Sequence, residues 1–179
     1  MKKTNNAFTL IELLIVIGIL AVLVVVVLLT INPTEVQRKA RDTQRMKDVS
    51  TLQTAIQQYL DNNAPPAAVV NVTSAGGTTT CAANWTGLNL CNYINSVPLD
   101  PTNNTLRQAA GANGAGACPA TTAAQTMVYR LYISTSGDYE VNVRQESPSN
   151  CKNLVNDGGN SNQWAELGST NTALTNLGD

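Results

Sequence analysis

The chain has 179 residues, and 11 basic against 12 acidic side chains give it a formal net charge of -1. This balance offers no clustered positive surface to follow a phosphate backbone, so nucleic-acid binding is not expected. The chain contains no histidine, which removes the commonest general base and the commonest metal ligand. No nucleophile–base pattern or phosphate-binding glycine loop occurs either, so we expect no enzyme and no cofactor.

The first predicted element is an apolar helix over Phe8–Ile31, read from FTLIELLIVIGILAVLVVVVLLTI. At about 1.5 Å per residue it would span roughly 35 Å, which is enough to cross the hydrocarbon core of a bilayer. A removable signal peptide would have a shorter apolar region, about 7–15 residues, before small residues at a cleavage site. The remaining interpretations are a plain single-span anchor and a leader cut before the apolar run.

The string KKTNNA-FTLIELLIVIGILAVL resembles the amino terminus shared by type IV pilins and type II secretion pseudopilins. The resemblance implies that prepilin peptidase removes a leader, residues 1–7, by cutting between Ala7 and Phe8. Phe8 would then be the first mature residue, and the family N-methylates it. The family usually has glycine where this chain has Ala7.

Glu12 is the one ionisable residue inside the apolar run. A carboxylate at the edge of a membrane helix costs about 2–3 kcal/mol on insertion scales, which indicates a function. The resemblance implies that Glu12 pairs with the α-amino group of Phe8 in a neighbouring subunit, so that misaligned subunits leave two charges unsatisfied. A local role is also open, because Thr9-x-x-Glu12 matches a capping box, and the two roles are compatible.

A second helix is predicted within residues 32–62. Pro33 should interrupt the first helix, and Thr34 should cap a segment from Glu35 to about Asp61. Its apolar residues have helical spacing, and opposite charges such as Arg45 and Asp48 are helical neighbours. We interpret the charged block Arg38–Lys47 as a solvated face, with contacts to adjacent subunits as the alternative.

Residues 63–168 are expected to form an extracytoplasmic domain with a small antiparallel sheet. Loops are predicted to about Thr126, including Val97–Pro101 (VPLDP), which resembles a stretch preceding the sheet in pseudopilins. Strands are predicted over 127–133 and 139–144, joined by a hairpin loop in which Gly137 can take positive φ. A third strand is expected near Gln163–Leu167, with Trp164 packing inward, and residues 169–179 are expected to be a flexible tail.

The four cysteines indicate disulfides and an oxidising compartment. Of the three possible pairings, the smallest loops favour one set, and four free thiols are the alternative. Zinc is disfavoured, since no CxxC pair occurs. The oxygens of Asp100 and Asp157 with nearby asparagines could bind calcium, but turn formation explains them and we assign no metal ligand. The favoured pairs are Cys81–Cys91 and Cys118–Cys151.

The sequence therefore predicts an α+β fold, in which a long helix, half membrane-spanning and half amphipathic, packs on a small antiparallel sheet. The resemblance implies a structural subunit that polymerises with copies of itself and other pilins. Its partners would be prepilin peptidase, inner-membrane assembly machinery and membrane lipid. The precursor would cross the inner membrane once, with its carboxyl-terminal part outside. The alternative is a single-span protein that presents an extracellular binding domain without polymerising.

Overall fold

A computed structural model describes residues 8–113, 117–155, 157, 161 and 163–169. The predicted leader, residues 1–7, and residues 170–179 of the predicted tail lie outside this range. The chain divides into two compact units, Met1–Val36 and Gln37–Asp179.

The two predicted helices are present as α1 (Leu10–Thr30) and α2 (Pro33–Asn62). The prediction of the cap was wrong. The side-chain oxygen of Asn32, not Thr34, accepts the backbone N–H groups of Thr34 and Glu35, at 3.2 and 3.3 Å. Asn32 directly precedes Pro33. Proline suits the first helical position because it has no backbone N–H that would need a partner there.

The main sheet has four antiparallel strands in the order β1 (Val70–Thr73), β4 (Tyr129–Ile133), β5 (Tyr139–Val143) and β6 (Ala165–Gly168). β4, β5 and β6 are the three strands that the sequence predicts. Gly137 has φ of 92° in the turn between β4 and β5, a conformation that glycine adopts without a steric cost. Trp164 is buried as predicted, but its ring lies between the guanidinium groups of Arg130 and Arg144, at 4.5 and 4.0 Å.

The region to Thr126 is not all loop, and that prediction was wrong. It contains β1, and it contains β2 (Thr105–Asn113), which pairs with β3 (Ala117–Met127) in a separate two-stranded sheet. β2 and β3 are rich in alanine and threonine, so they lack the apolar alternation that predicts a strand. β1 (VNVT) does alternate, but over only four residues. After β5 follow the 3-10 turn η1 (Pro148–Asn150) and the short helix α3 (Cys151–Val155).

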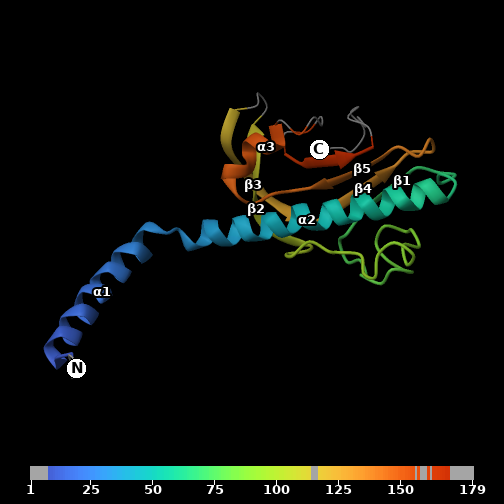
Figure 1. Cartoon of the computed structure of the whole chain (residues 1–179). Helices are drawn as coiled ribbons and strands as arrows, with labels where there is room; N and C mark the ends of the chain where they lie inside the picture. Colours follow the sequence, from blue (N-terminus) through green and yellow to red (C-terminus); the bar gives the residue numbers. More distant parts are fainter. Residues whose placement is uncertain (1–7, 114–116, 156, 158–160, 162, 170–179) are drawn as a thin grey trace, which may run out of the picture. The chain divides into compact units, whose positions relative to one another are not determined.

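The core of the second unit lies between α2 and one face of the main sheet (Figure 1). Val49, Leu52 and Ile56 of α2 are fully buried, as the helical spacing predicts, and each contributes about 1.5–3 kcal/mol by burial. The loop between β1 and β2 completes the same cluster. Most of the other buried members come from that loop and from the main sheet, with one from β2 and one from α3: Trp85, Leu88, Leu90, Val97, Ala110, Tyr129, Leu131, Ile133, Tyr139, Val141, Val143, Leu154 and Ala165.

A buried ion network joins α2 to the rest of the domain, and its centre is Arg45, which is fully buried. Its guanidinium binds Asp100 at 2.6 and 3.0 Å, Asp42 at 2.8 Å and Glu146 at 2.7 Å. The solvated face predicted for this block is therefore wrong at Asp42 and Arg45. Arg45 turns inward and does not pair with Asp48, whose carboxylate instead accepts the hydroxyl of Tyr129 at 2.9 Å.

The acidic members of this network have further donors. Asp42 accepts the backbone N–H groups of Glu146 and Ser147, each at 2.8 Å. Arg41 binds the same Glu146 carboxylate through two nitrogens, at 2.8 and 2.5 Å. Burial alone would raise the pKa of Glu146, but the hydrogen bonds from Arg41 and Arg45 outweigh it, and the pKa lies below its ordinary value. Glu146 is thereby favoured in its ionised form, and Arg45 also pairs with the buried carboxylates of Asp42 and Asp100.

Replacing Arg45 with methionine keeps the volume but removes the charge that these carboxylates share. We expect Arg45→Met to lower the free energy of unfolding by about 3–5 kcal/mol, because an uncompensated buried charge is costly. Lys47→Met on the exposed side of the same helix is the matched control and should change it by less than about 0.5 kcal/mol. Urea unfolding of the detergent-solubilised protein, followed by tryptophan fluorescence, measures the stability of both variants. The same urea midpoint in Arg45→Met as in Lys47→Met would contradict the role given to Arg45.

Candidate functional site: the amino-terminal helix

The predicted cleavage point lies at the edge of the described residues. Ala7 lies outside them, and Phe8 is the first residue described, with 87% of its surface exposed. Phe8 precedes α1 outside any helix or strand, and the backbone of Thr9, which follows it, is extended. The backbone on the carboxyl side of the predicted cut is therefore outside the helix, which is where a peptidase can reach an extended substrate.

Glu12 lies in the first turn of α1, the helix labelled so in Figure 1, and closes a capping box with Thr9. Its carboxylate accepts the backbone N–H and the hydroxyl of Thr9, both at 2.8 Å, and its own N–H donates to the Thr9 hydroxyl oxygen at 3.3 Å. The local role predicted for Glu12 is therefore present in the single chain. Both groups of Thr9 bind the same carboxylate oxygen, Oε2, so no donor among the described residues occupies Oε1.

The rest of α1 is almost entirely apolar, and its large apolar side chains are exposed among the residues that the structure describes. Every large apolar side chain described from Phe8 to Leu28 is at least 51% exposed. The segment Leu10–Leu28 has a mean hydropathy of 3.3 and is, among the described residues, the one helix long and apolar enough to cross a membrane. Such a surface is not stable in water and needs lipid or other apolar helices around it.

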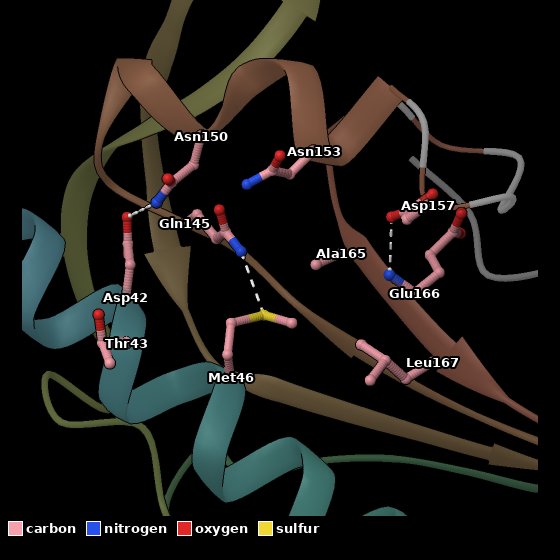
Figure 2. Close-up of a pocket in the computed structure, with 10 residues that line it drawn as sticks. All are labelled: Asp42, Thr43, Met46, Gln145, Asn150, Asn153, Asp157, Ala165, Glu166 and Leu167. Carbon is pink, nitrogen blue, oxygen red and sulfur yellow. Dashed lines mark hydrogen bonds between the residues drawn. The ribbon is translucent and has the colours of Figure 1, made fainter.

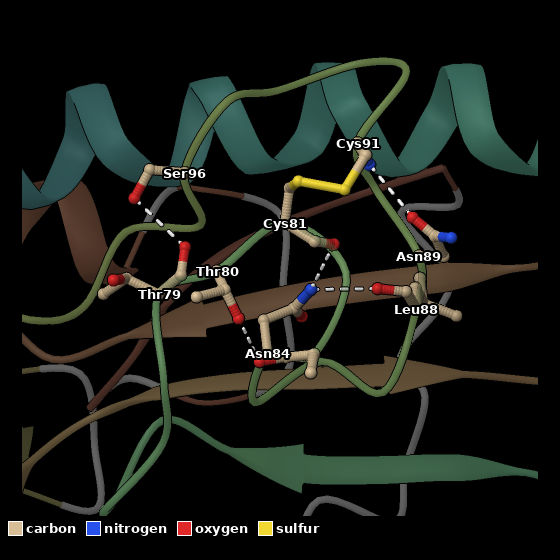
Figure 3. The surroundings of a disulfide bond; sticks show 9 residues. Thr79, Thr80, Cys81, Asn84, Leu88, Asn89, Cys91 and Ser96 are labelled. Atoms are coloured by element: carbon tan, nitrogen blue, oxygen red, sulfur yellow. Dashed lines mark hydrogen bonds between the residues drawn. A yellow bond between two sulfur atoms is a disulfide. The ribbon is translucent and has the colours of Figure 1, made fainter.

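A disulfide joins Cys81 to Cys91, which confirms that predicted pair (Figure 3). Inside the loop it closes, the side chain of Asn84 donates to the carbonyl oxygens of Cys81 and Leu88, each at 2.9 Å. Cys151 is also disulfide-bonded. The side chain of Cys118 lies outside the described ones, so the pair Cys118–Cys151 stays a prediction.

The candidate oxygen ligands of the loops have structural partners. Asp100 binds Arg45, and Asn103 donates to the carbonyl of Ser74 at 2.9 Å. Among the described residues, no three acidic or cysteine side chains gather closely enough to hold a metal ion. Asn160, one of the asparagines near Asp157 in the sequence, lies outside the described residues.

A cavity of about 470 Å³ lies between α2, α3 and β6 (Figure 2). Figure 2 shows Met46 on one side, the amide of Gln145 in the middle, and Asn150 and Asn153 opposite. The amide of Gln145 donates to the sulfur of Met46 at 3.2 Å. This lining offers neither a nucleophile with a base nor a charged pair, so it has no evident chemistry.

Glu166, beside this cavity, is held in an unusual environment. Its backbone N–H donates to Asp157 at 3.0 Å, and its carboxylate accepts the N–H of Ser161 at 3.1 Å. Burial raises the pKa of Glu166 to about 7; the Ser161 bond opposes this shift, and the negative charges of Glu140 and Asp157 add to it.

Residues 2–28 match the family model described as the prokaryotic N-terminal methylation motif. This motif is the prepilin-type cleavage and methylation segment of type IV pilins and pseudopilins. The matched segment is of the kind that prepilin peptidase processes in type IV pilin-like precursors, and it includes most of an apolar helix suited to membrane anchoring. No curated protein and no solved structure matches this chain.

The raised pKa of Glu166 predicts a pH dependence of stability. The folded chain holds this proton more tightly than the unfolded chain, so stability should fall as pH rises from about 4.5 to about 7. Glu166→Gln should flatten this part of the profile. Urea unfolding at pH 4.5, 6 and 7.5 tests this; the same slope in Glu166→Gln as in the unchanged protein would contradict it.

Proposed function

We propose that the mature chain, beginning at Phe8, is a subunit of a filament of the type IV pilus or type II secretion kind. The observation that carries this proposal is an apolar helix exposed on every side, directly after a prepilin-type leader, with a single carboxylate in its first turn. A plain membrane anchor needs the helix, but it needs neither the processing segment nor Glu12.

The physical chemistry of α1 supports assembly. Moving it from lipid into a bundle of like helices keeps its apolar surface covered, and close packing adds dispersion contacts. Glu12 is the element that can set the axial register. Its Oε1 can accept a hydrogen bond from the α-amino group of Phe8 in a neighbouring copy. Any other axial offset between the two helices leaves both charges unpaired in an apolar surrounding.

The second unit supports a location outside the cytoplasm for the carboxyl-terminal part. Disulfides such as Cys81–Cys91 persist in oxidising compartments and are rare in the cytosol. In this proposal the precursor crosses the inner membrane once, and assembly machinery extracts the mature subunit into a filament of its own copies and other pilins.

The first test is the amino terminus of the protein, measured by mass spectrometry of membrane and sheared surface fractions. We expect N-methylated Phe8 in the sheared fraction. Ala7→Gly, which restores the residue usual in the family, should be processed at least as fully, and Ala7→Glu should block processing. Intact Met1 confined to the membrane would instead favour the single-span protein that presents a binding domain.

The second test separates assembly from anchoring. Glu12→Gln removes the charge but keeps a side chain that can still cap α1, so the variant should remain in the membrane at normal level. Without the carboxylate, we expect the yield of sheared filaments to fall at least tenfold. Glu35→Gln, in the first turn of α2, is the matched control. Filaments of normal yield from Glu12→Gln would exclude the register role.

A further inference from the structure

Three tripeptides in the second unit have the form Asn-x-Thr, which is the acceptor pattern for N-linked glycosylation. The acceptors are Asn71, Asn84 and Asn103, with Thr73, Thr86 and Thr105 two residues later. A pattern this short arises readily by chance in a chain rich in asparagine and threonine. The surroundings of each side chain therefore have to decide which of them an enzyme could use.

The amide of Asn84 is fully engaged. Its nitrogen donates to the carbonyl oxygens of Cys81 and Leu88, and its oxygen accepts the N–H of Thr86 at 2.9 Å and the hydroxyl of Thr86 (Figure 3 shows the two donated bonds). Thr86, which an enzyme would have to recognise, is fully buried. Glycosylating Asn84 would mean taking apart the turn inside the disulfide loop.

Asn103 is engaged in a similar way. Its amide nitrogen donates to the carbonyl of Ser74 at 2.9 Å, and its oxygen accepts the hydroxyl of Ser74 at 2.8 Å. The hydroxyl of Ser74 in turn accepts the N–H of Tyr129, at 2.9 Å. This asparagine joins the loop before β2 to the end of β1, and its side chain is half-buried, so a glycan on its nitrogen would have to fit beside that connection.

Asn71 differs from both. It lies in β1, at the edge of the main sheet, and alternation places it and Thr73 on the exposed face while Val70 and Val72 are half-buried. Its amide makes no hydrogen bond within the part of the chain that the structure describes. Within that part, β1 pairs only with β4, so one edge of the strand is open. The amide nitrogen of Asn71 and the hydroxyl of Thr73 therefore lie on the same exposed face of an extended strand.

We propose that Asn71 is an N-glycosylation site of this protein, with Thr73 as the residue that the transferring enzyme recognises. The donor is a glycan linked through its anomeric carbon to a polyprenyl phosphate or diphosphate, used outside the cytoplasm. The amide nitrogen of Asn71 attacks that carbon, and the N–C bond forms as the C–O bond to phosphate breaks. The lipid phosphate leaves with the bonding electrons, and the amide nitrogen gives up one proton to a base of the enzyme.

The modification is compatible with the fold and independent of polymerisation. Cross-strand pairing places Tyr132 of β4 opposite Asn71, and this side chain is half-buried. The first sugar can lie over the ring of Tyr132 without displacing any contact of the core. The proposal needs the second unit to be outside the cytoplasm, but it does not need a filament.

The experiment is mass spectrometry of the full chain from its native host. Trypsin should leave all three candidate asparagines in one peptide, residues 48–107, because this stretch has no internal lysine or arginine. We expect this peptide to carry the added mass of one or more sugars, and electron-transfer fragmentation should place that mass on Asn71.

Matched variants separate the acceptor pattern from general effects on the fold. Asn71→Gln and Thr73→Val should remove the added mass, Thr73→Ser should retain it, and Asn95→Gln, an exposed asparagine outside the pattern, should not affect it. A peptide 48–107 without sugar, sugar retained in Asn71→Gln, or sugar lost in Thr73→Ser would each overturn the proposal. Processing at Phe8 is read from the same samples, so failure here is distinguishable from failure of the proposed function.

Discussion

The burial of one guanidinium group organises the second unit. Arg45 comes from the middle of α2, and its carboxylate partners come from the loop before β2 and from the segment after β5. A charge buried this deeply is tolerated only when it is fully paired, so each of these segments is held to the helix. The backbone N–H groups that bind Asp42 extend the constraint to the start of η1.

Polar contacts also hold the long loop between β1 and β2. Besides its buried apolar residues, the loop is held by the disulfide, by the amide of Asn84 and by a bond from the indole of Trp85 to the carbonyl of Pro98 at 3.0 Å. Asparagine and threonine side chains replace the backbone pairing that a regular strand would have. Asn71 lies in β1, directly before this loop, on the exposed face of the strand.

Local signals predicted much of the molecule correctly. The apolar run, Pro33, the alternation of β4 and β5 and the glycine of their turn each depend on near neighbours in the chain, and all appear as predicted. The errors have a common origin. β1, β2 and β3 are strands because of the partners they pair with, and Thr34 was expected to cap α2 although Asn32 has the better-placed oxygen.

By itself the sequence determined that this protein has a prepilin-type amino-terminal motif, an apolar helix with Glu12 near its start, and a carboxyl-terminal part with four cysteines. These features follow from composition and short spacing. Only the tertiary structure decided that Asp42 and Arg45 are buried, and that Asn71 is open to solvent while Asn84 and Asn103 are engaged. The physical reason is that the sequence around a charged or amide side chain is the same whether that side chain binds water or a residue distant in the chain.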